Sequence, residues 1–135
     1  MNLPCLILGL WCSQGTITGP AYVQDGDTIY INHEPVRLAG IDAEELDEPH
    51  GVEAREHLRQ LIGGEVVTCF WEGYSYKRKV GHCYAGGFLQ LSRHDLNATM
   101  VQDGYALDCY NYSHGLYRSL EPAGARSRLI QKGYC

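Results

Sequence analysis

Acidic side chains gather at two places in this chain, and carboxylates placed in this way can bind a metal ion or move a proton. The first place is the turn Asp25-Gly26-Asp27. The second is the segment 42–50, which contains five acids: Asp42, Glu44, Glu45, Asp47 and Glu48. Either group alone is more often a solvated turn or loop than a functional site.

The predicted strands beside the two acidic groups indicate that the groups lie close together. Asp27 begins one predicted strand and Asp42 ends the next, so antiparallel pairing would bring both carboxylates to the same end of a sheet. Converging carboxylates repel one another unless they share a cation. Because all these ligands are oxygen atoms, a hard ion such as Ca²⁺ is favoured over zinc.

Two arginines could complete a site for a phosphodiester. Arg37 lies five residues before Asp42 on the same predicted strand, and Arg78 begins a later strand. Displacement at phosphorus places extra negative charge on the phosphoryl oxygens, which a metal ion and guanidinium groups can stabilise. Tyr110 and Tyr112, two apart in a segment predicted to be extended, would project to one face, where they either stack on a base or cover the core.

The elements that must position these side chains are short. β-rich runs joined at Asp25-Gly26 predict a hairpin over 21–32, and further strands are predicted over 34–41, 65–73 and 78–87. A helix is predicted over 51–64, with its apolar face formed by Val52, Leu58, Leu61 and Ile62.

The second half of the chain favours helices. A capping pattern from Ser92 to Asp95 predicts a helix that ends at Gly104, followed by an extended piece over 105–112 and a partly helical tail over 113–135. Five strands followed by helices indicate an α+β domain built on a small barrel.

Composition limits the possible functions. A chain of 135 residues with 44% apolar and 20% charged residues is typical of one folded domain. The net charge of −5 has the wrong sign for a protein that holds nucleic acid by charge alone, so any phosphate site must be local.

The six cysteines and the N-terminus indicate a compartment. No C-x-x-C pair is present, so zinc has no support and disulfides fit better. The apolar stretch from Leu3 to Trp11 is too short for a membrane span. Residues 1–18 are therefore either a signal-like segment or an apolar extension packed on a domain of residues 19–135. Paired cysteines favour export, to the periplasm or the medium.

Five motifs together resemble the staphylococcal nuclease-like (thermonuclease) family. They are VQDGDT at 23–28, RLAGIDAEE at 37–45, GVEA at 51–54, YKR at 76–78 and the D-L-N-x-x-M-V-x-x-G-x-A pattern at 95–106. The resemblance runs from about residue 21 to residue 133. It implies an OB-fold, a barrel of five strands with about three helices, which agrees with the layout above.

The resemblance also implies a metal site and a base. Asp27 and Asp42 would ligate Ca²⁺ together with the backbone carbonyl of Ala43, and Asp25 would lie outside the direct ligands. Glu45 would act on the attacking water, as general base or as the group that positions it.

The remaining implied roles concern the phosphate and the nucleotide. Arg37 and Arg78 would hold the scissile phosphate and stabilise its transition state. Tyr76, Tyr110 and Tyr112 would contact the nucleotide. Enzymes of this family break the P–O5′ bond of DNA or RNA and leave 3′-phosphates.

Three positions depart from the family pattern. Glu44 replaces a proline directly before the glutamate, and we expect it to add a charge beside the metal and to loosen the loop. Lys77 replaces a glycine before Arg78, and Ser75 replaces a lysine of the staphylococcal enzyme.

The cysteines are an addition to the family core. Cys69 and Cys83 lie symmetrically about Tyr76 on the two strands of one predicted hairpin, so a cross-strand bridge is reasonable. Cys109 and Cys135 would then tie the C-terminus to the body of the domain. Four cysteines allow three pairings, of which this is the one we predict.

Three functions remain open at this point. The leading hypothesis is a Ca²⁺-dependent nuclease with little sequence preference, a monomer that prefers single strands. The alternatives are a binding module for nucleic acid or protein on the same fold, and a disulfide-stabilised protein with a vestigial site. A binding module has no need of a water-activating carboxylate beside a metal site, so the complete set favours the enzyme: Asp27, Arg37, Asp42, Glu45 and Arg78.

Overall fold

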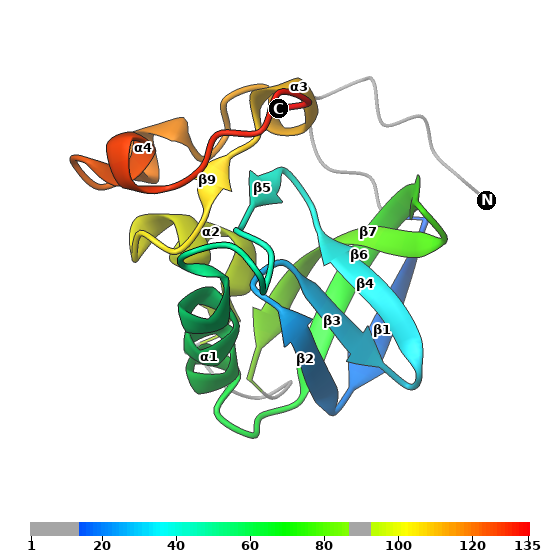
Figure 1. The fold of residues 1–135 in the computed structure, drawn as a ribbon. Coiled ribbons are helices and arrows are strands. Elements are labelled where there is room, and N and C mark those ends of the chain that lie inside the picture. The colour runs from blue at the N-terminus through cyan, green and yellow to red at the C-terminus, as the bar shows by residue number, and fades with distance from the viewer. Residues whose placement is uncertain (1–13, 87–92) are drawn as a thin grey trace.

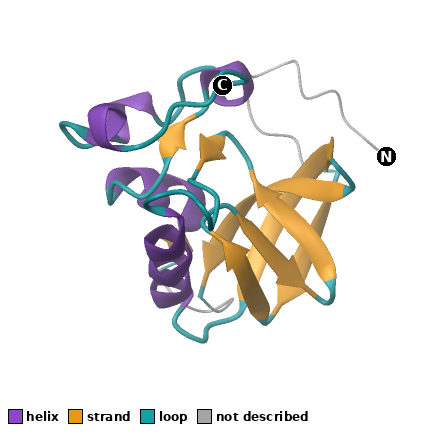
Figure 2. Ribbon diagram, in the orientation of Figure 1, coloured by secondary structure: helices purple, strands orange, loops and turns teal. Residues whose placement is uncertain are grey.

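The computed structural model describes residues 14–86 and 93–135. Figure 1 and Figure 2 show the helices on one side and at one end of the β-sheet. The strands are β1 (Gly15–Gly19), β2 (Ala21–Asp25), β3 (Thr28–Ile31), β4 (Glu34–Leu38), β5 (Ile41–Asp42), β6 (Val67–Ser75), β7 (Arg78–Ala85), β8 (His94–Asp95) and β9 (Leu107–Asp108). The helices are α1 (Gly51–Ile62), α2 (Leu96–Gln102), α3 (Tyr110–Ser113) and α4 (Ala125–Arg128), with a 3₁₀ turn, η1 (Arg118–Leu120). None of the described helices is long and apolar enough to cross a membrane.

The main sheet has seven strands in the order β1-β6-β7-β4-β3-β2, with β8 added to β7. The α+β class that we expected is confirmed, but the closed five-stranded barrel is not. Within the described residues no ladder joins β1 to β2, so the sheet stays open, and β5 pairs with β9 in a small sheet of its own. The additional strands β1 and β8 are short, and β1 begins inside the segment assigned to the N-terminal extension.

Two-residue turns close two of the hairpins. Asn32 and His33 join β3 to β4 with φ of 52° and 65°, and Tyr76 and Lys77 join β6 to β7 with φ of 51° and 69°. Two consecutive residues with positive φ match the twist of the flanking strands. Lys77 therefore adopts the backbone that a glycine would take, and its presence does not prevent the turn before Arg78.

The core lies between the sheet and the first two helices. It contains Ile29, Ile31, Val36 and Leu38 from β3 and β4, and Leu96, Met100 and Val101 from α2. Helix α1 forms as predicted, but its buried face is Gly51, Ala54, Leu58 and Ile62. Val52 is 48% exposed because it lies about 200° around the helix from Ala54.

The segment after the sheet differs from the prediction at both ends. Helix α2 begins at Leu96, where the Asp95 carboxylate accepts a hydrogen bond from the Ala98 N–H at 2.9 Å. The predicted start at Ser92 lies outside the described residues. The extended piece predicted over 105–112 is wrong, because only β9 is extended and α3 follows it. The Asp108 carboxylate accepts from the Ser113 hydroxyl and thereby favours the helical turn.

Two disulfides confirm the predicted pairing. Cys69 and Cys83 are opposite one another on β6 and β7 and are fully buried. Cys109 and Cys135 join the start of α3 to the end of the chain. Cys5, Cys12 and the apolar stretch 3–11 lie outside the described residues.

Candidate active site

A contact between small residues brings the two acidic groups together. A Cβ atom on Gly26 would lie 2.7 Å from the Cβ atoms of both Ala43 and Ala54. The turn between β2 and β3 therefore packs directly on the loop after β5 and on α1. This approach lets the Asp27 carboxylate accept a hydrogen bond from the Ala43 N–H at 2.8 Å.

Arg37 joins the two carboxylates that the sequence predicts as metal ligands. Its Nη2 atom lies 3.3 Å from Asp27 Oδ2 and 3.5 Å from Asp42 Oδ1. Arg37 faces Thr28 in the β3–β4 ladder, and its Nη1 donates to the Leu38 carbonyl at 2.9 Å. The side chains of Asp27 and Asp42 are only 6% and 4% exposed. The structure thus brings Asp27, Arg37 and Asp42 together at one end of the sheet.

Burial makes the charge on these carboxylates unfavourable. The pKa of Asp27 is raised to about 7, first by burial and then by the nearby charges of Asp25 and Asp42, while Arg37 acts in the opposite direction. Burial also raises the pKa of Asp42, against the opposing effects of Tyr134 and Arg37. A single guanidinium does not compensate two buried carboxylates, so this pocket favours a further cation.

The donor chemistry fits a hard divalent ion. No group of three or more His, Cys, Asp and Glu side chains within residues 14–86 and 93–135 is arranged to hold a metal. The predicted ligands Asp27 and Asp42 would supply carboxylate oxygens, and the backbone of Ala43 lies beside them, with its N–H donating to Asp27 Oδ2. A set made of oxygen atoms only suits Ca²⁺ or Mg²⁺ and does not suit zinc.

Glu45 is the exposed acid of this site. Partial burial and the charges of Asp25, Asp42 and Glu48 raise its pKa, while Lys132 opposes them. Its backbone is fixed at both ends, since the Glu45 N–H donates to Glu48 Oε1 at 2.7 Å and the Glu45 carbonyl accepts from the Glu48 N–H at 2.9 Å. An accessible carboxylate with a raised pKa is suited to accept a proton from water.

Glu44 behaves differently from our expectation. It is buried, and its carboxylate accepts hydrogen bonds from the His50 N–H at 2.8 Å and from the Ile130 N–H at 3.1 Å. The His50 ring lies 3.0 Å from the same carboxylate. These contacts lower the pKa of Glu44 against the effect of burial. Glu44 therefore stiffens the loop that proline stiffens elsewhere in the family. Its negative charge is stabilised by these donors.

The second predicted arginine reaches the same end of the sheet from β7. Arg78 Nη1 donates to the Thr28 hydroxyl at 3.1 Å, and Arg78 Nε donates to the Ser75 carbonyl at 3.1 Å. Thr28 is also the ladder partner of Arg37, and β4 pairs with β7, so the two arginines lie in the same region of the sheet. Such a pair can hold two oxygens of a phosphate group.

The three predicted tyrosines are placed differently from one another. Tyr76 is 92% exposed in the turn before Arg78, whose guanidinium lies 6.0 Å from the centre of its ring. Tyr110 and Tyr112 are both exposed, but on α3 they lie about 200° apart, so our expectation that they share a face is wrong. Tyr110 lines the same small hollow as Asp42, which keeps it next to the carboxylates.

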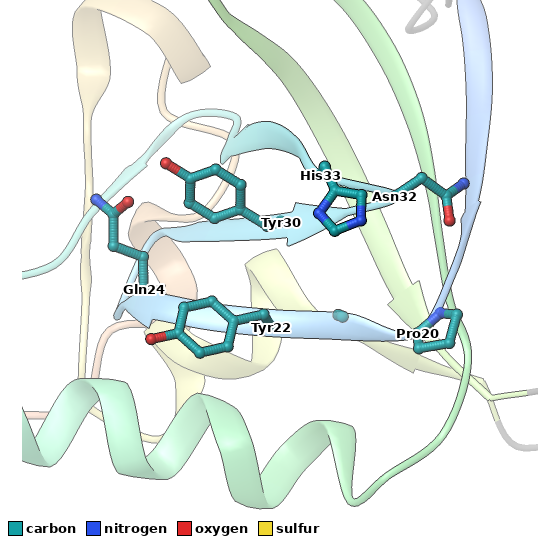
Figure 3. A pocket seen from close by; sticks show the side chains of 7 residues that line it. Pro20, Tyr22, Gln24, Tyr30, Asn32 and His33 are labelled. Carbon is teal, nitrogen blue, oxygen red and sulfur yellow. The ribbon is translucent and has the colours of Figure 1, made fainter.

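A tyrosine pair that the sequence analysis missed lies on the outer face of the β2–β3 hairpin. Tyr22 and Tyr30 are ladder partners whose ring centres are 6.4 Å apart, edge to face. They line a shallow hollow with Gln24, and Figure 3 shows both hydroxyls directed toward the Gln24 end of the strands. Since Tyr30 and Thr28 are two residues apart on β3, this face continues into the arginine pair.

The C-terminal tail supplies the other residues that the sequence analysis missed. The Tyr134 hydroxyl donates to Asp42 Oδ1 at 2.5 Å, and Lys132 Nζ lies 2.5 Å from Glu48 Oε1. Burial and the contact with Asp42 raise the pKa of Tyr134 far above its usual range, so this hydroxyl stays protonated. The sole signal in the sequence was Cys135, which predicted that the tail returns to the domain.

Three known proteins are similar to this chain in sequence. The chain is 40% identical over 94 residues to a micrococcal nuclease of Shigella flexneri, an alignment that covers 62% of this chain and 53% of that protein. It is 33% identical over 117 residues to the succinoglycan biosynthesis protein ExoI of Rhizobium meliloti (strain 1021), covering 78% of this chain and 59% of that protein. A third relative, an uncharacterized 38.1 kDa protein of Capnoides sempervirens, is 36% identical over 76 residues and is covered for 21% of its length, against 55% of this chain.

The chain spans between about one fifth and three fifths of the length of these relatives. The family model for staphylococcal nuclease homologues matches residues 35–133, which include Arg37, Asp42, Glu45 and Arg78. That match covers more than half of the sequence and confirms the resemblance. It contains four of the five motifs, while VQDGDT at 23–28 lies before it. On these grounds the chain belongs to the staphylococcal nuclease homologue family.

Proposed function

We propose that this chain is a Ca²⁺-dependent phosphodiesterase that cleaves DNA or RNA with little sequence preference and leaves 3′-phosphates. The observation that carries the proposal is the convergence of two buried carboxylates and two guanidinium groups at one end of the sheet, with Glu45 beside them. Family membership and the similarity to a micrococcal nuclease support the same chemistry.

Each of these residues has a defined part in hydrolysis. Asp27 and Asp42 would hold the ion, which when bound supplies positive charge next to the scissile phosphate. Glu45 accepts a proton from water, whose oxygen attacks phosphorus, or holds that water in line with the P–O5′ bond. Arg37 and Arg78 donate hydrogen bonds to the phosphoryl oxygens as negative charge builds on them. The P–O5′ bond then breaks, and the 5′ oxygen takes up a proton as it leaves.

We expect single strands to be the better substrate. The protein has a net charge of −5 and cannot hold a stiff duplex by charge alone. The exposed rings of Tyr22, Tyr76 and Tyr110 and the partly buried ring of Tyr30 can stack only on bases that are accessible. Equal cleavage rates on single-stranded and duplex DNA of one sequence would contradict this expectation.

The test of the activity is direct. Purified protein is incubated with labelled single-stranded DNA and RNA in Ca²⁺ and then in EGTA, and the product ends are identified by their response to phosphatase. We expect cleavage in Ca²⁺, none in EGTA, and 3′-phosphate ends. Cleavage that continues unchanged in EGTA would contradict the metal dependence, and 5′-phosphate ends would contradict the proposed bond.

One observation favours a second candidate, a binding module without turnover. Arg37 already contacts both carboxylates, and Tyr134 donates to Asp42, so the two acids have partners of their own. A module of this kind would bind single strands in EGTA as tightly as in Ca²⁺ and would leave them intact. Filter binding alongside the cleavage assay separates the two functions.

The setting in which the protein acts is part of the proposal. Two disulfides fit an oxidising compartment, and we infer a periplasmic or secreted protein that works as a monomer. Gel filtration with light scattering tests the monomer, and cell fractionation tests the location. The nuclease-like domain comprises residues 19–135, and residues 1–18 form a signal-like or apolar extension whose last residues, 15–18, pair in the sheet as part of β1.

A further inference from the structure

The C-terminal segment from Ile130 to Cys135 runs along the loop that carries the acids. Figure 1 shows its red trace passing β9 and β5 and ending beside α3. It makes one contact with each of three acids: the Ile130 N–H with Glu44, Lys132 Nζ with Glu48, and the Tyr134 hydroxyl with Asp42. These partners are 86, 84 and 92 residues apart in sequence, so the contacts exist only in the folded chain.

The tail has little regular structure to hold it in this place. No helix or strand is present between Leu129 and Cys135. Its end is fixed by the Cys109–Cys135 disulfide, and Asn111 adds two hydrogen bonds, from its N–H to the Cys135 carbonyl at 2.8 Å and from its side chain to the Tyr134 carbonyl at 3.1 Å. Tyr134 directly precedes the cysteine, so the covalent link sets where its ring can lie.

The contact with Asp42 is the one that touches the proposed cation site. Tyr134 donates to Asp42 Oδ1 at 2.5 Å, whereas Arg37 approaches the same oxygen no closer than 3.5 Å. Asp42 lies at the end of a two-residue strand, so the backbone ladder constrains it weakly. The short hydrogen bond therefore decides how the carboxylate is oriented before any ion arrives. A ligand that is already oriented loses less freedom when it binds.

We propose that Tyr134 is a positioning residue for Asp42 and that the Cys109–Cys135 disulfide delivers it to the site. Cation affinity then depends on whether this disulfide is formed, and a chain in a reducing compartment has a weak site. The inference rests on the proposed function, because it assumes that Asp42 binds Ca²⁺. It also assigns the second disulfide a task that the first does not share, since Cys69 and Cys83 are buried within the sheet.

The test measures Ca²⁺ affinity separately from catalysis. Wild-type protein, Tyr134→Phe and the double variant Cys109→Ser/Cys135→Ser are titrated with Ca²⁺ by calorimetry, and kcat and KM are measured over a range of Ca²⁺ concentrations. Tyr134→Phe keeps the ring and the disulfide and removes only the hydroxyl. We expect its Kd for Ca²⁺ to rise about 3- to 10-fold, with kcat largely restored at saturating Ca²⁺. The double cysteine variant should show at least the same rise.

Two controls separate positioning from stability. Tyr74→Phe removes an exposed hydroxyl from β6, and Cys69→Ala/Cys83→Ala removes the disulfide in the sheet. Both should keep the wild-type Kd when measured below their unfolding temperatures. A wild-type Kd in Tyr134→Phe would overturn the inference while leaving the proposed function intact. Wild-type protein that neither binds Ca²⁺ nor cleaves would overturn both.

Discussion

The two halves of the candidate site are held by different forces. The sheet half consists of Thr28, Arg37 and Arg78, whose positions follow from the ladders between β3, β4 and β7. The loop half consists of residues 42–48, and it is held by side-chain hydrogen bonds and ion pairs to His50 and to the C-terminal tail.

This difference predicts how each half responds to mutation. Backbone ladders do not depend on which side chain stands at a position, so the sheet half should lose chemistry without losing stability. In the loop half, hydrogen bonds and ion pairs of the side chains themselves hold the loop in place. A change there should affect stability, metal affinity or both, unless the side chain is an exposed one such as Glu45.

The largest effect on the cleavage rate is expected at Glu45, whose exposed side chain does not hold the loop. Glu45→Gln removes the proton acceptor and keeps the shape, so the cleavage rate should fall by about 10² to 10⁴-fold while nucleotide affinity and the melting temperature stay near wild type. Single-turnover kinetics and thermal unfolding measure these quantities. Glu53→Gln, an exposed change on α1, is the control. A wild-type rate in Glu45→Gln would show that another group accepts the proton.

Arg78 tests the sheet half. Arg78→Lys keeps the charge but loses the planar fork that reaches the Thr28 hydroxyl and the Ser75 carbonyl. We expect a rate loss on the order of 10² to 10³-fold, by analogy with the removal of one transition-state donor, and little change in melting temperature. Arg55→Lys on α1 is the matched control. A melting temperature that falls steeply in Arg78→Lys would contradict the independence of the sheet half.

Glu44 tests the loop half. Glu44→Gln leaves three donors facing an amide in place of a carboxylate, so the free energy of unfolding should fall by about 1.5 to 3 kcal/mol. Urea unfolding measures this change. Asp47→Asn makes the same change of charge at an exposed position of the same loop and should cost little. If the two variants unfold at the same urea concentration, the hydrogen bonds of Glu44 do not stabilise the loop.

The pH dependence of stability sharpens the contrast further. The folded-state pKa of Asp27 is raised to about 7, so its stabilising contribution is present below its unfolded value of 3.8 and is lost as pH rises toward 7. The folded-state pKa of Glu44 is lowered, so its contribution is present above 4.5 and is lost at lower pH. In EGTA the melting temperature should therefore decrease modestly from pH 5 to pH 8.

Added Ca²⁺ should reverse that decrease, because it binds the ionised carboxylates of the folded state. Differential scanning calorimetry at several pH values, with EGTA or Ca²⁺, measures both effects. A melting temperature in EGTA that rises through this interval would contradict the raised pKa of Asp27. Asp27→Asn is the control, since its stability should vary less with pH.

Features that depend on local signals are predicted from the sequence, as most of the sheet half is. The hairpin around Gly26, helix α1 and the cross-strand pair Cys69–Cys83 depend on signals within a few residues or on the symmetry of one hairpin, and all three are confirmed. The approach of Arg37 to Asp27 follows from the pairing of β3 with β4, which hydrophobic pattern and turn chemistry predict well. Asp42 is not on the same strand as Arg37, as the sequence predicts, but on the separate strand β5, which pairs with β9.

The remainder depends on contacts between distant parts of the chain. The donors to Glu44 and Asp42 come from residues 130 and 134, and no local pattern links them to the loop. The prediction that Tyr110 and Tyr112 lie in an extended segment is wrong, because the buried Asp108 carboxylate accepts hydrogen bonds from the Ser113 hydroxyl and the Tyr117 N–H and favours a turn at that point.

The close contact of Gly26 with Ala43 and Ala54 has a consequence for protein engineering. The hairpin and the loop can lie this close because Gly26 has no side chain. A Cβ atom at this position would lie 2.7 Å from the Cβ atoms of both alanines. Attempts to alter ion preference by enlarging residues at this junction would separate the two acidic segments before they changed the ligands. Room for redesign lies instead around the rings of Tyr22 and Tyr76, which are largely exposed to solvent.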